Sequence, residues 1–489
     1  MHKTYLHISL ITILLLFSSV LQAQPRLTVV VVIDGLTQEN LNAMQPYWSA
    51  GGLRLLSEEA THTTATFPHE VCGGQETMAT YMTGTTPAYH GIMGNYFYNR
   101  KERTPQPILL DKDVTGLGTS HTISPRSLLS TTITDEWRIR YGSQAKIYAI
   151  GLHPEATVLM AGHAANACCW LDATSCNWVT TSFYPEGLPA AADRMNMGGR
   201  IDLLAERKWE PSMDISLYNF HTDKERKRSF SYLNKNHLLN TPTANSLVIE
   251  LALAQQKAQA LGTDQTPDLL LLHLNTLTPK AQSDAIESAE QEDMYLNINN
   301  DLGLLIEQLN KRIGKTQYQL FVIGRPIKGY SISALQKANF PIQRFNSDRA
   351  AALVSTYLMA IYGHERWVDG GYGPFIYLNR MLIEKKKMSL ETIQRQVANF
   401  LMDFEGVQVA YPIYEAVTSD DKHSIYRKHA GDVYFRLQDN WQLEIDENTL
   451  YDCVIQGHPT VPVFHWTGGY ITIPEGKHSA TDIESLILR

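Results

Sequence analysis

The chain is 489 residues long, 44% hydrophobic and 19% charged, and it carries a formal net charge of −8. A chain of this length can bury a large core, and its composition is that of a globular protein rather than a disordered one. The mild excess of acid argues against a nucleic-acid partner. Composition therefore leaves enzymes and binding proteins open.

The first 23 residues differ from the rest of the chain. They read MHKTYLHISLITILLLFSSVLQA, with Lys3 ahead of an apolar stretch from Ile8 to Leu16. This is the pattern of a secretory signal peptide, and the apolar stretch is too short for a comfortable membrane span. We therefore expect a signal peptide at 1–23, no transmembrane segment after its removal, and an exported mature protein.

Strand and helix patterns follow one another along the first half of the chain. We expect strands at 27–36, 146–152 and 158–162, a helix at 53–60 and a strand hairpin at 168–181. The strand at 27–36 delivers Asp34 near its end. Residues from about 185 to 240 are less regular and are expected to form an insertion, or cap, packed on the main domain.

Alternation resumes in the second half. We expect helices at 244–261, 287–312, 346–362 and about 390–403, and strands at 268–275, 318–324, 374–380, 431–437 and 460–466. Strands separated by helices of this length predict a mainly parallel sheet that is covered on both faces. The predicted fold class is therefore α/β, with three α/β/α layers and an inserted cap region.

The cysteine count is odd. At least one thiol stays unpaired unless it bonds another chain, and export permits a disulfide. Cys168 or Cys169 with Cys176 is the closest pair in sequence, but the pairing is left open, and this spacing is not that of zinc ligands. The five cysteines are Cys72, Cys168, Cys169, Cys176 and Cys453.

Several motifs resemble the alkaline phosphatase superfamily, in particular its type I phosphodiesterases, nucleotide pyrophosphatases and phosphate-irrepressible periplasmic phosphatases. TGTTPAYHGIMGNYFYN at 83–99 is similar to the family segment TGSxPxxHGIxGNxWYD. Other similar stretches are AGHAANACCW (161–170), LNTPTANSLVIELA (239–252), EDMYLNINNDLGLLIEQLN (292–310), WVDGGYGPFIYLNR (367–380) and GDVYFRLQDNW (431–441). The likeness runs nearly end to end, so it implies an alkaline-phosphatase-like fold over 24–489.

The resemblance also implies a metal site. Enzymes of this family hold two zinc ions that activate a nucleophile and stabilise the leaving oxygen. In this chain the ligand positions hold Asp34, Thr278, Gln282, Arg325, Pro326 and Thr460. Only Asp34 keeps a ligand, and a lone carboxylate cannot hold a catalytic zinc, which takes about three protein ligands. We expect no bound metal and no cofactor, with Arg325 neutralising Asp34 instead.

The remaining family positions are also changed. The position of the nucleophile falls on Gly74, which has no side chain to attack phosphorus. The Lys-x-Arg phosphate clamp is replaced by His153-Pro154-Glu155, whereas the phosphate-contacting asparagine is kept as Asn95. We expect no catalytic residue here, and Asn95, His153 and Glu155 as the candidate remnant of a ligand cleft.

These observations favour a pseudoenzyme. We interpret the chain as an exported pseudophosphatase, periplasmic, outer-membrane-associated or secreted in a Gram-negative bacterium, that binds or scaffolds an unknown protein or envelope ligand. The alternative is a metal-dependent phosphohydrolase or phosphodiesterase of the same superfamily, with zinc as its cofactor.

Other interpretations of single residues stay open. Cys72 with His69 could form the nucleophile and base of a metal-free hydrolase, which requires contact in space. His153 and Glu155 with His458 could build a new metal site. His163 is expected to be structural, and Asp34 to be a buried partner of a cation or a helix cap.

Overall fold

The computed structural model describes most of the chain after the expected signal peptide. The described residues are 24–71, 73–219, 230, 235–279, 281, 283–327, 330–331, 335–336, 339–444, 453–454, 457–469 and 472–489. The signal peptide predicted at 1–23 lies outside them, as do Cys72 and Gln282.

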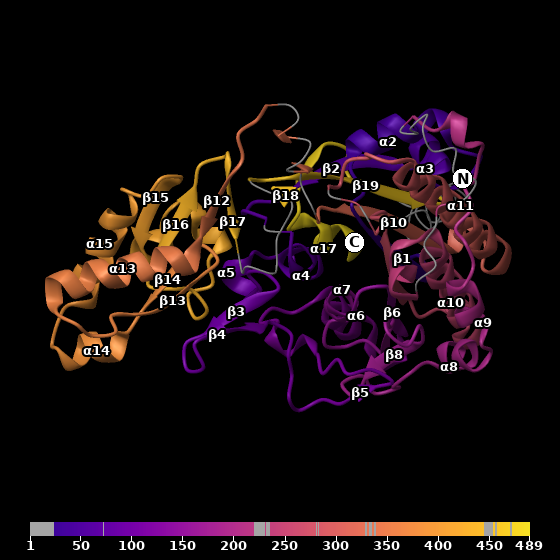
Figure 1. The fold of residues 1–489 in the computed structure, drawn as a ribbon. Helices are drawn as coiled ribbons and strands as arrows, with labels where there is room; N and C mark the ends of the chain where they lie inside the picture. The colour runs from indigo at the N-terminus through magenta and orange to yellow at the C-terminus, as the bar shows by residue number, and fades with distance from the viewer. Residues whose placement is uncertain are drawn as a thin grey trace, which may run out of the picture.

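A ten-stranded mixed sheet forms the centre of the larger lobe (Figure 1). Its strands in spatial order are β20 (Lys477–Ser479), β2 (Thr61–Thr66), β19 (Thr460–Thr467), β10 (Tyr318–Arg325), β1 (Leu27–Asp34), β9 (Asp268–Asn275), β6 (Ile147–Gly151), β7 (Ala167–Leu171), β8 (Trp178–Thr181) and β5 (Gly116–Leu117). The five from β10 to β7 run parallel, and β19 and β8 flank them antiparallel. The parallel strands are apolar and fully buried, as a sheet covered on both faces requires.

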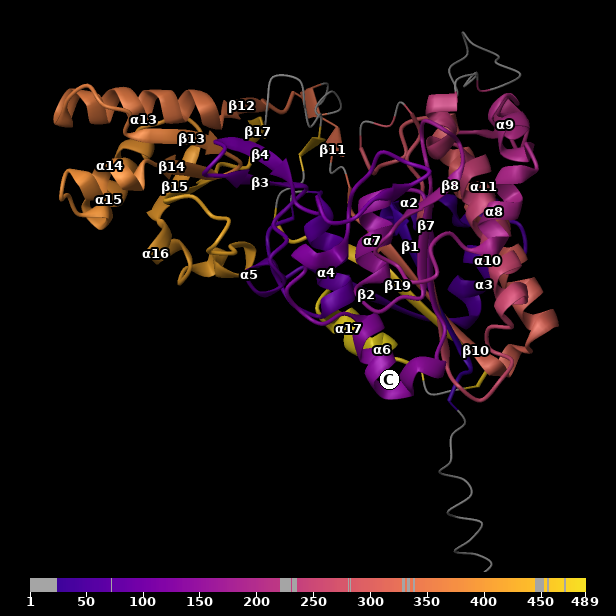
Figure 2. The ribbon, with the colours of Figure 1, turned by 90° about the horizontal axis from the view of Figure 1, so that it is seen from below.

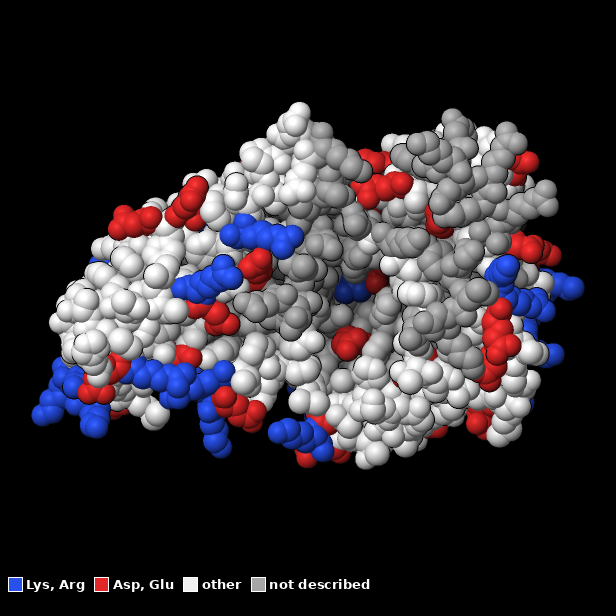
Figure 3. All heavy atoms as spheres, in the orientation of Figure 1, with Lys and Arg blue, Asp and Glu red and all other residues white. Residues whose placement is uncertain are grey.

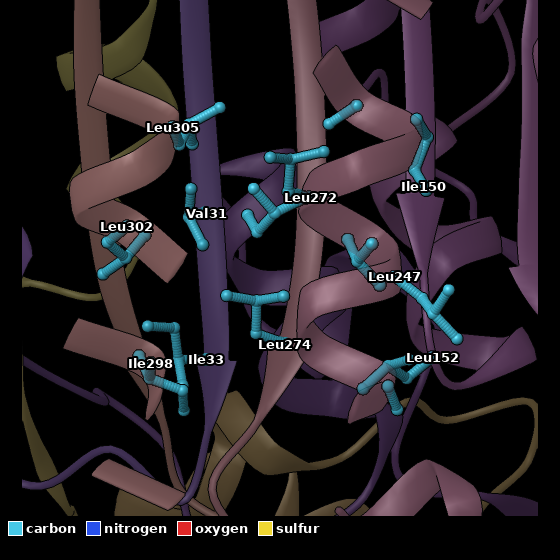
Figure 4. Close-up of a cluster of buried hydrophobic side chains, with 14 of the residues drawn as sticks. Val31, Ile33, Ile150, Leu152, Leu247, Leu272, Leu274, Ile298, Leu302 and Leu305 are labelled. Carbon is cyan, nitrogen blue, oxygen red and sulfur yellow. The ribbon is translucent and has the colours of Figure 1, made fainter. Parts of the chain in front are cut away.

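Helices cover both faces of this sheet (Figure 2). One face carries α2 (Gln38–Met44), α3 (Gly52–Glu59), α10 (Pro242–Gln259) and α11 (Ala289–Arg312), and the other carries α4 (Gln75–Thr83), α6 (Ile133–Tyr141), α7 (Pro154–Ala161) and α17 (Asp482–Ile487). Side chains of β1 alternate between the two cores: Val31 and Ile33 face α11, while Val32 faces the α4 side. Figure 4 shows Val31 and Ile33 directed toward Ile298 and Leu302 of α11. The predicted three-layer α/β/α class is confirmed.

A second lobe lies beside the larger one (Figures 1 and 2). It is built on an antiparallel sheet in the order β13 (Val368–Tyr372), β14 (Phe375–Leu378), β16 (Val433–Leu437) and β15 (Val407–Pro412). Its helices are α13 (Ser347–Tyr362), α14 (Arg380–Lys385), α15 (Leu390–Leu401) and α16 (Ile413–Ala416). Strands β12 (Gln343–Asn346) and β17 (Trp441–Glu444) pair with each other where the chain enters and leaves it.

A hairpin of the larger lobe packs against the second one. Strands β3 (Tyr96–Asn99) and β4 (Thr104–Pro107) bring Tyr98 into a small core with Phe375 and Tyr377 of the four-stranded sheet. The Tyr98 hydroxyl donates a hydrogen bond to the Asp369 carbonyl at 3.0 Å. The lobes are therefore joined by packed side chains as well as by the chain itself.

One expected strand is wrong, and two others lie in a different sheet. The strands expected at 374–380 and 431–437 form as β14 and β16, but β14 pairs with β13 and β16 in the second lobe, outside the main sheet. The strand expected at 158–162 is the end of helix α7, which starts with Pro154 in its first turn and ends before Gly162. A short apolar run cannot by itself distinguish a strand from a buried helix.

The irregular region at 185–240 is described in part. It contains α8 (Ala190–Met197), α9 (Arg200–Ala205), η4 (Ile215–Leu217) and η5 (Lys235–Asn240). The Tyr218 hydroxyl donates to Asp293 Oδ1 of α11 at 2.7 Å, and the Ser212 N–H donates to the same oxygen at 2.8 Å. These bonds fasten the segment to the larger lobe on its α10–α11 side.

The hairpin expected at 168–181 is confirmed as β7 and β8. The thiols of Cys168 and Cys169 are buried, and neither is joined to Cys176 by a disulfide. Across the described ranges, no helix is both long enough and apolar enough to cross a membrane.

Candidate functional site

Three strand ends meet at one edge of the main sheet. The parallel register sets Asp34 of β1 opposite Arg325 of β10 on one side and Asn275 of β9 on the other. The carboxyl ends of parallel strands are where α/β folds place their ligands and catalytic groups. This edge is therefore the candidate site, and its chemistry depends on what surrounds Asp34.

Both carboxylate oxygens of Asp34 are occupied by nitrogen donors. Arg325 Nη1 lies 3.0 Å from Oδ1, and His273 Nε2 lies 3.0 Å from Oδ2. The Leu152 N–H points at His273 Nδ1 at 3.4 Å, so Nδ1 accepts and Nε2 carries the proton that faces Asp34. Asp34 thus pairs with the Arg325 cation and lies against the His273 ring, with all three side chains almost fully buried.

Arg325 also holds the start of helix α4. Its Nε donates to Thr77 Oγ1 at 2.8 Å, and its Nη2 donates to the Gly74 carbonyl at 3.0 Å. A longer contact of 3.4 Å reaches Gln75 Oε1. Because Arg325 is only 2% exposed, these neighbours replace the water that a guanidinium normally has. The residue ties together β1, β10 and α4.

The charges around Asp34 favour its ionised form. Burial alone opposes ionisation, but the Arg325 charge and the His273 N–H outweigh it and hold the pKa of Asp34 well below its usual range. His153, which starts α7, stands edge-on to His273 with ring centroids 5.4 Å apart. Burial, helped by the neighbouring His273 and Arg325, lowers the pKa of His153 to about 4, so its ring is neutral near pH 7.

The position of the nucleophile is filled by another side chain. Gly74 immediately precedes α4, and its N–H donates to Glu76 Oε1 at 3.1 Å. A Cβ on residue 74 would lie 2.6 Å from Glu76 Oε2 and 3.1 Å from Asn95 Oδ1. Glu76 is only 1% exposed, so this carboxylate occupies the space that a side chain at residue 74 would need.

The other expected ligand positions carry no ligand chemistry. Thr278 is buried after β9, and its carbonyl accepts the Ala281 N–H at 3.0 Å. Pro326 is buried beside Arg325 and has no donor atom in its side chain. Thr460 is exposed on β19, where its hydroxyl lies 2.9 Å from that of Thr66.

The side chains at this edge do not fit zinc. A zinc ligand must offer a free lone pair from Cys, His, Asp or Glu, whereas Asp34 Oδ1 already accepts from Arg325 and Oδ2 lies 3.0 Å from His273 Nε2. The guanidinium would also repel a cation brought to the same carboxylate. Within the described ranges, no group of three or more His, Cys, Asp or Glu side chains is arranged to hold a metal.

Of the two residues of the alternative hydrolase, the structure describes only His69. His69 is buried, with Nε2 2.9 Å from Thr80 Oγ1 and Nδ1 2.9 Å from the Glu70 carbonyl. Burial lowers the pKa of His69 to about 4. Cys72 lies outside the described residues, so its contact with His69 stays a prediction.

The remaining candidate residues lie in ordinary structural settings. His163 Nδ1 pairs with Asp135 at 2.9 Å near the start of α6, in line with the structural role expected for it. His458 is exposed and its Nδ1 lies 2.8 Å from the Phe67 carbonyl. Glu155 is half-buried in the first turn of α7.

Sequence reasoning missed three residues of this site. His273 lies in the apolar strand DLLLLHLN. A histidine in the middle of such a buried run was the one sequence feature that could have marked it as part of the site. Glu76 and Thr77 lie just after the nucleophile position, and nothing in their spacing marks them. Glu76 bonds locally to the Gly74 N–H, whereas the contact of Thr77 with Arg325 forms only when α4 packs against β10.

The face between the two lobes is hollowed. Figure 3 shows this hollow, with basic and acidic atoms visible at its floor. A hollow bordered by two lobes that pack on each other offers a concave surface for a ligand or a partner.

Comparison with known proteins gives one family. The family model for type I phosphodiesterase / nucleotide pyrophosphatase matches residues 28–470. The chain is 26% identical over 458 residues to alkaline phosphatase PhoV of Synechococcus elongatus, covering 86% of this chain and 81% of PhoV. It is 23% identical over 397 residues to alkaline phosphatase PafA of Elizabethkingia meningoseptica, covering 76% and 72%.

Solved structures give the same fold. The crystal structure of wild-type PafA superposes with a TM-score of 0.81 at 21% identity, covering 95% of this chain and 96% of that one. Murine ectonucleotide pyrophosphatase / phosphodiesterase 5 gives a TM-score of 0.51 at 13% identity, with 95% and 94% covered. At such identities the likeness concerns the fold alone.

Proposed function

The chain belongs to the type I phosphodiesterase / nucleotide pyrophosphatase family, within the alkaline phosphatase superfamily, and from that premise we propose that it is a non-catalytic member. Its role is that of an exported binding or scaffold protein. The observation that carries this proposal is the buried ion pair between Arg325 and Asp34, at 3.0 Å. That pair stands where the family resemblance implies a metal-binding Asp-His turn.

The chemistry of the family explains why Arg325 and Pro326 in place of a metal-binding Asp and His support this proposal. Uncatalysed hydrolysis of phosphate esters is among the slowest reactions known, so a catalyst needs both a nucleophile and strong charge stabilisation. Here the nucleophile position is Gly74, and the space beside it holds the Glu76 carboxylate. The only cation that contacts Asp34 among the described residues is a guanidinium engaged by four neighbours.

The former phosphate clamp has the wrong charge for phosphate. The resemblance places two cations where this chain has His153 and Glu155. The pKa of His153, lowered to about 4, leaves its ring neutral at pH 7, and the acidic side chain Glu155 supplies no cation for a phosphate dianion. These two positions therefore suit a neutral or hydrogen-bonding ligand, or a protein surface, better than a phosphate ester.

The leader-like segment at 1–23 supports export, and the periplasm, the outer membrane or the medium of a Gram-negative bacterium is the proposed location. The partner is a protein or an envelope ligand.

The competing function is a zinc-dependent phosphohydrolase or phosphodiesterase. The names of PhoV and PafA, both alkaline phosphatases, favour it. It requires Arg325 to leave Asp34 and other side chains to supply the ligands. The two functions differ in one measurable property, which is tight binding of zinc at Asp34.

Zinc content after incubation with the metal and exhaustive dialysis tests the proposal. Wild type and the matched variant Asp34→Asn are compared by elemental mass spectrometry, together with hydrolysis of a phosphate monoester and a phosphodiester. We expect less than about a tenth of an equivalent of zinc in both proteins and no turnover. About one or two equivalents in wild type that are lost in Asp34→Asn, together with turnover, would establish the enzyme instead.

A further inference from the structure

Basic side chains gather at the outer end of the second lobe. Figure 1 places α14 at this end, away from the main sheet, and Figure 3 shows Lys and Arg side chains along the same edge of the molecule. The whole chain carries a formal net charge of −8. A local excess of cations on an acidic protein points to an anionic partner.

Three exposed lysines follow one another at the end of α14. They are Lys385, Lys386 and Lys387. Lys386 pairs with Glu365 at 3.0 Å, which joins the end of α14 to the segment before β13. Within the described ranges, Lys385 and Lys387 form no ion pair, so their charges face solvent.

Two arginines meet at Asp369, next to this run of lysines. Arg103 Nε lies 3.1 Å from Asp369 Oδ1, and Arg366 Nη2 donates to the Asp369 carbonyl at 3.2 Å. The Arg366 carbonyl accepts from Asn379 Nδ2 at 2.9 Å, which holds this group beside the start of α14. The Asp369 side chain is only 12% exposed, so the cations lie outside the acid.

Two further arginines cover the buried Asp432. Arg100 Nη1 lies 2.8 Å from Oδ2, and Arg380 Nε lies 2.6 Å from Oδ1. In the part of the chain that the structure describes, the Nη nitrogens of Arg380 and Arg103 donate to no protein atom. These nitrogens are therefore available to an acceptor outside the molecule.

These residues, with the exposed acid Glu384, are called the α14 tip below. Its charged members are Arg100, Arg103, Glu365, Arg366, Asp369, Arg380, Glu384, Lys385, Lys386, Lys387 and Asp432. The seven cations exceed the four acids by three, and two of the acids lie beneath arginines. The α14 tip therefore presents an excess of positive charge to solvent.

An apolar side chain stands among these charges. Met381 is 75% exposed, and it precedes Lys385 by four residues, so the two share one face of α14. A small anion is held by donors that converge in a concave site, whereas these cations are spread over exposed side chains at the outer end of the lobe (Figure 2). A broad anionic surface with an apolar layer beneath it suits this arrangement.

We propose that the α14 tip binds the surface of an anionic phospholipid bilayer. Lys385, Lys387 and the open arginine nitrogens contact lipid phosphates, and Met381 enters the headgroup layer. An excess of three charges gives weak, reversible binding that salt screens. The inference rests on the charges of the second lobe, so its failure would leave the proposed loss of catalysis untouched.

Co-sedimentation with vesicles tests the proposal. The mature chain is mixed with vesicles of phosphatidylcholine alone or with about a third of phosphatidylglycerol, at about 50 mM and about 300 mM salt. We expect binding to the phosphatidylglycerol vesicles only, weakened about five-fold or more at the higher salt. Equal binding to neutral vesicles, or no binding to either kind, overturns the proposal.

Matched variants locate the contact. Lys385→Gln/Lys387→Asn removes two cations of the α14 tip, and asparagine suits the left-handed φ of 55° at residue 387. Lys257→Gln/Lys311→Asn removes the same charge from exposed positions of α10 and α11 in the larger lobe. We expect the first variant to lower the binding constant about ten-fold or more and the second less than about two-fold. Equal losses would assign the effect to net charge and overturn the proposal. Circular dichroism melting verifies that each variant is folded.

Met381→Ser separates a bilayer from a soluble polyanion. We expect it to weaken vesicle binding about three-fold or more, because apolar contact is lost, and to leave binding of dextran sulfate unchanged. Vesicle binding that Met381→Ser does not alter overturns the proposal. Binding of dextran sulfate without binding to vesicles also overturns it, and would assign the α14 tip to a soluble anionic polymer.

Discussion

Two buried aspartates, one in each lobe, are neutralised in different ways. Asp432 in the second lobe is 0% exposed and accepts from Arg100 Nη1 at 2.8 Å and from Arg380 Nε at 2.6 Å. Both arginines reach it from the surface, with 27% and 50% of their side chains exposed. Asp34 in the larger lobe depends on Arg325, which is itself 2% exposed. Asp432 therefore pairs with partly hydrated arginines, whereas Asp34 pairs with an arginine that is buried.

The two aspartates should differ in how much stability is lost when one arginine partner is removed. Asp432 has two arginines and also accepts the Leu378 N–H at 2.7 Å, so its charge is satisfied several times over. Asp34 has a single cation and one imidazole N–H. A buried charge that loses its only cation cannot be rescued by solvent, whereas a partly hydrated pair loses little. The following predictions measure that difference.

The largest effect is expected for Arg325→Met. Removing the guanidinium leaves Asp34 ionised and buried, and it removes the bonds to Thr77 and to the Gly74 carbonyl. We expect the free energy of unfolding to fall by about 3–5 kcal/mol, measured by urea denaturation. The double variant Asp34→Asn/Arg325→Met should regain part of the loss. Equal loss in the single and double variants would mean that Arg325 acts by packing alone.

The free energy of unfolding should depend on pH differently in wild type and in Arg325→Met. In wild type the pKa of Asp34 is lowered, so its contribution is present above about pH 4, the unfolded value, and is lost as the pH falls further. Without Arg325, burial dominates and raises that pKa, so acid relieves the variant. The stability difference should therefore shrink between pH 7 and pH 4 in denaturation curves. A difference that is constant over this range would contradict the assignment.

The smallest effect is expected for Arg380→Ala. Its guanidinium is half exposed, and Asp432 keeps Arg100, so we expect a loss below about 1 kcal/mol. Arg100→Ala should cost more, about 1.5–2 kcal/mol, because Arg100 also stacks over Tyr377 at 4.8 Å. Thermal melting of the two variants side by side gives the order. The reverse order would show that exposure does not decide the strength of these pairs.

Much of the fold and part of the site could be predicted from the sequence. The strands at 268–275 and 318–324 could be predicted because they are continuous apolar runs, and the long helices because their apolar residues recur at the helical period. The pairing of Arg325 with Asp34 could be predicted because the family resemblance places both residues at ligand positions of one metal site, each at the end of a strand. The structure confirms that pair.

The rest depends on contacts between distant segments. His273 became the second partner of Asp34 only through the parallel register of β1 and β9, which no local pattern states. The second lobe was missed because the hairpin turn at GP between β13 and β14 weighs little against a long run of alternating helices and strands. Whether zinc is absent, and whether export occurs, stay predictions.

The Glu76 carboxylate couples residue 74 to the start of α4. A Cβ at residue 74 would lie 2.6 Å from Glu76 Oε2, so a threonine placed there requires the end of the Glu76 side chain to move. Such a movement would disturb the bond in which Glu76 Oε1 accepts the Gly74 N–H at 3.1 Å. The conformation of the Glu76 side chain and the size of residue 74 therefore have to change together.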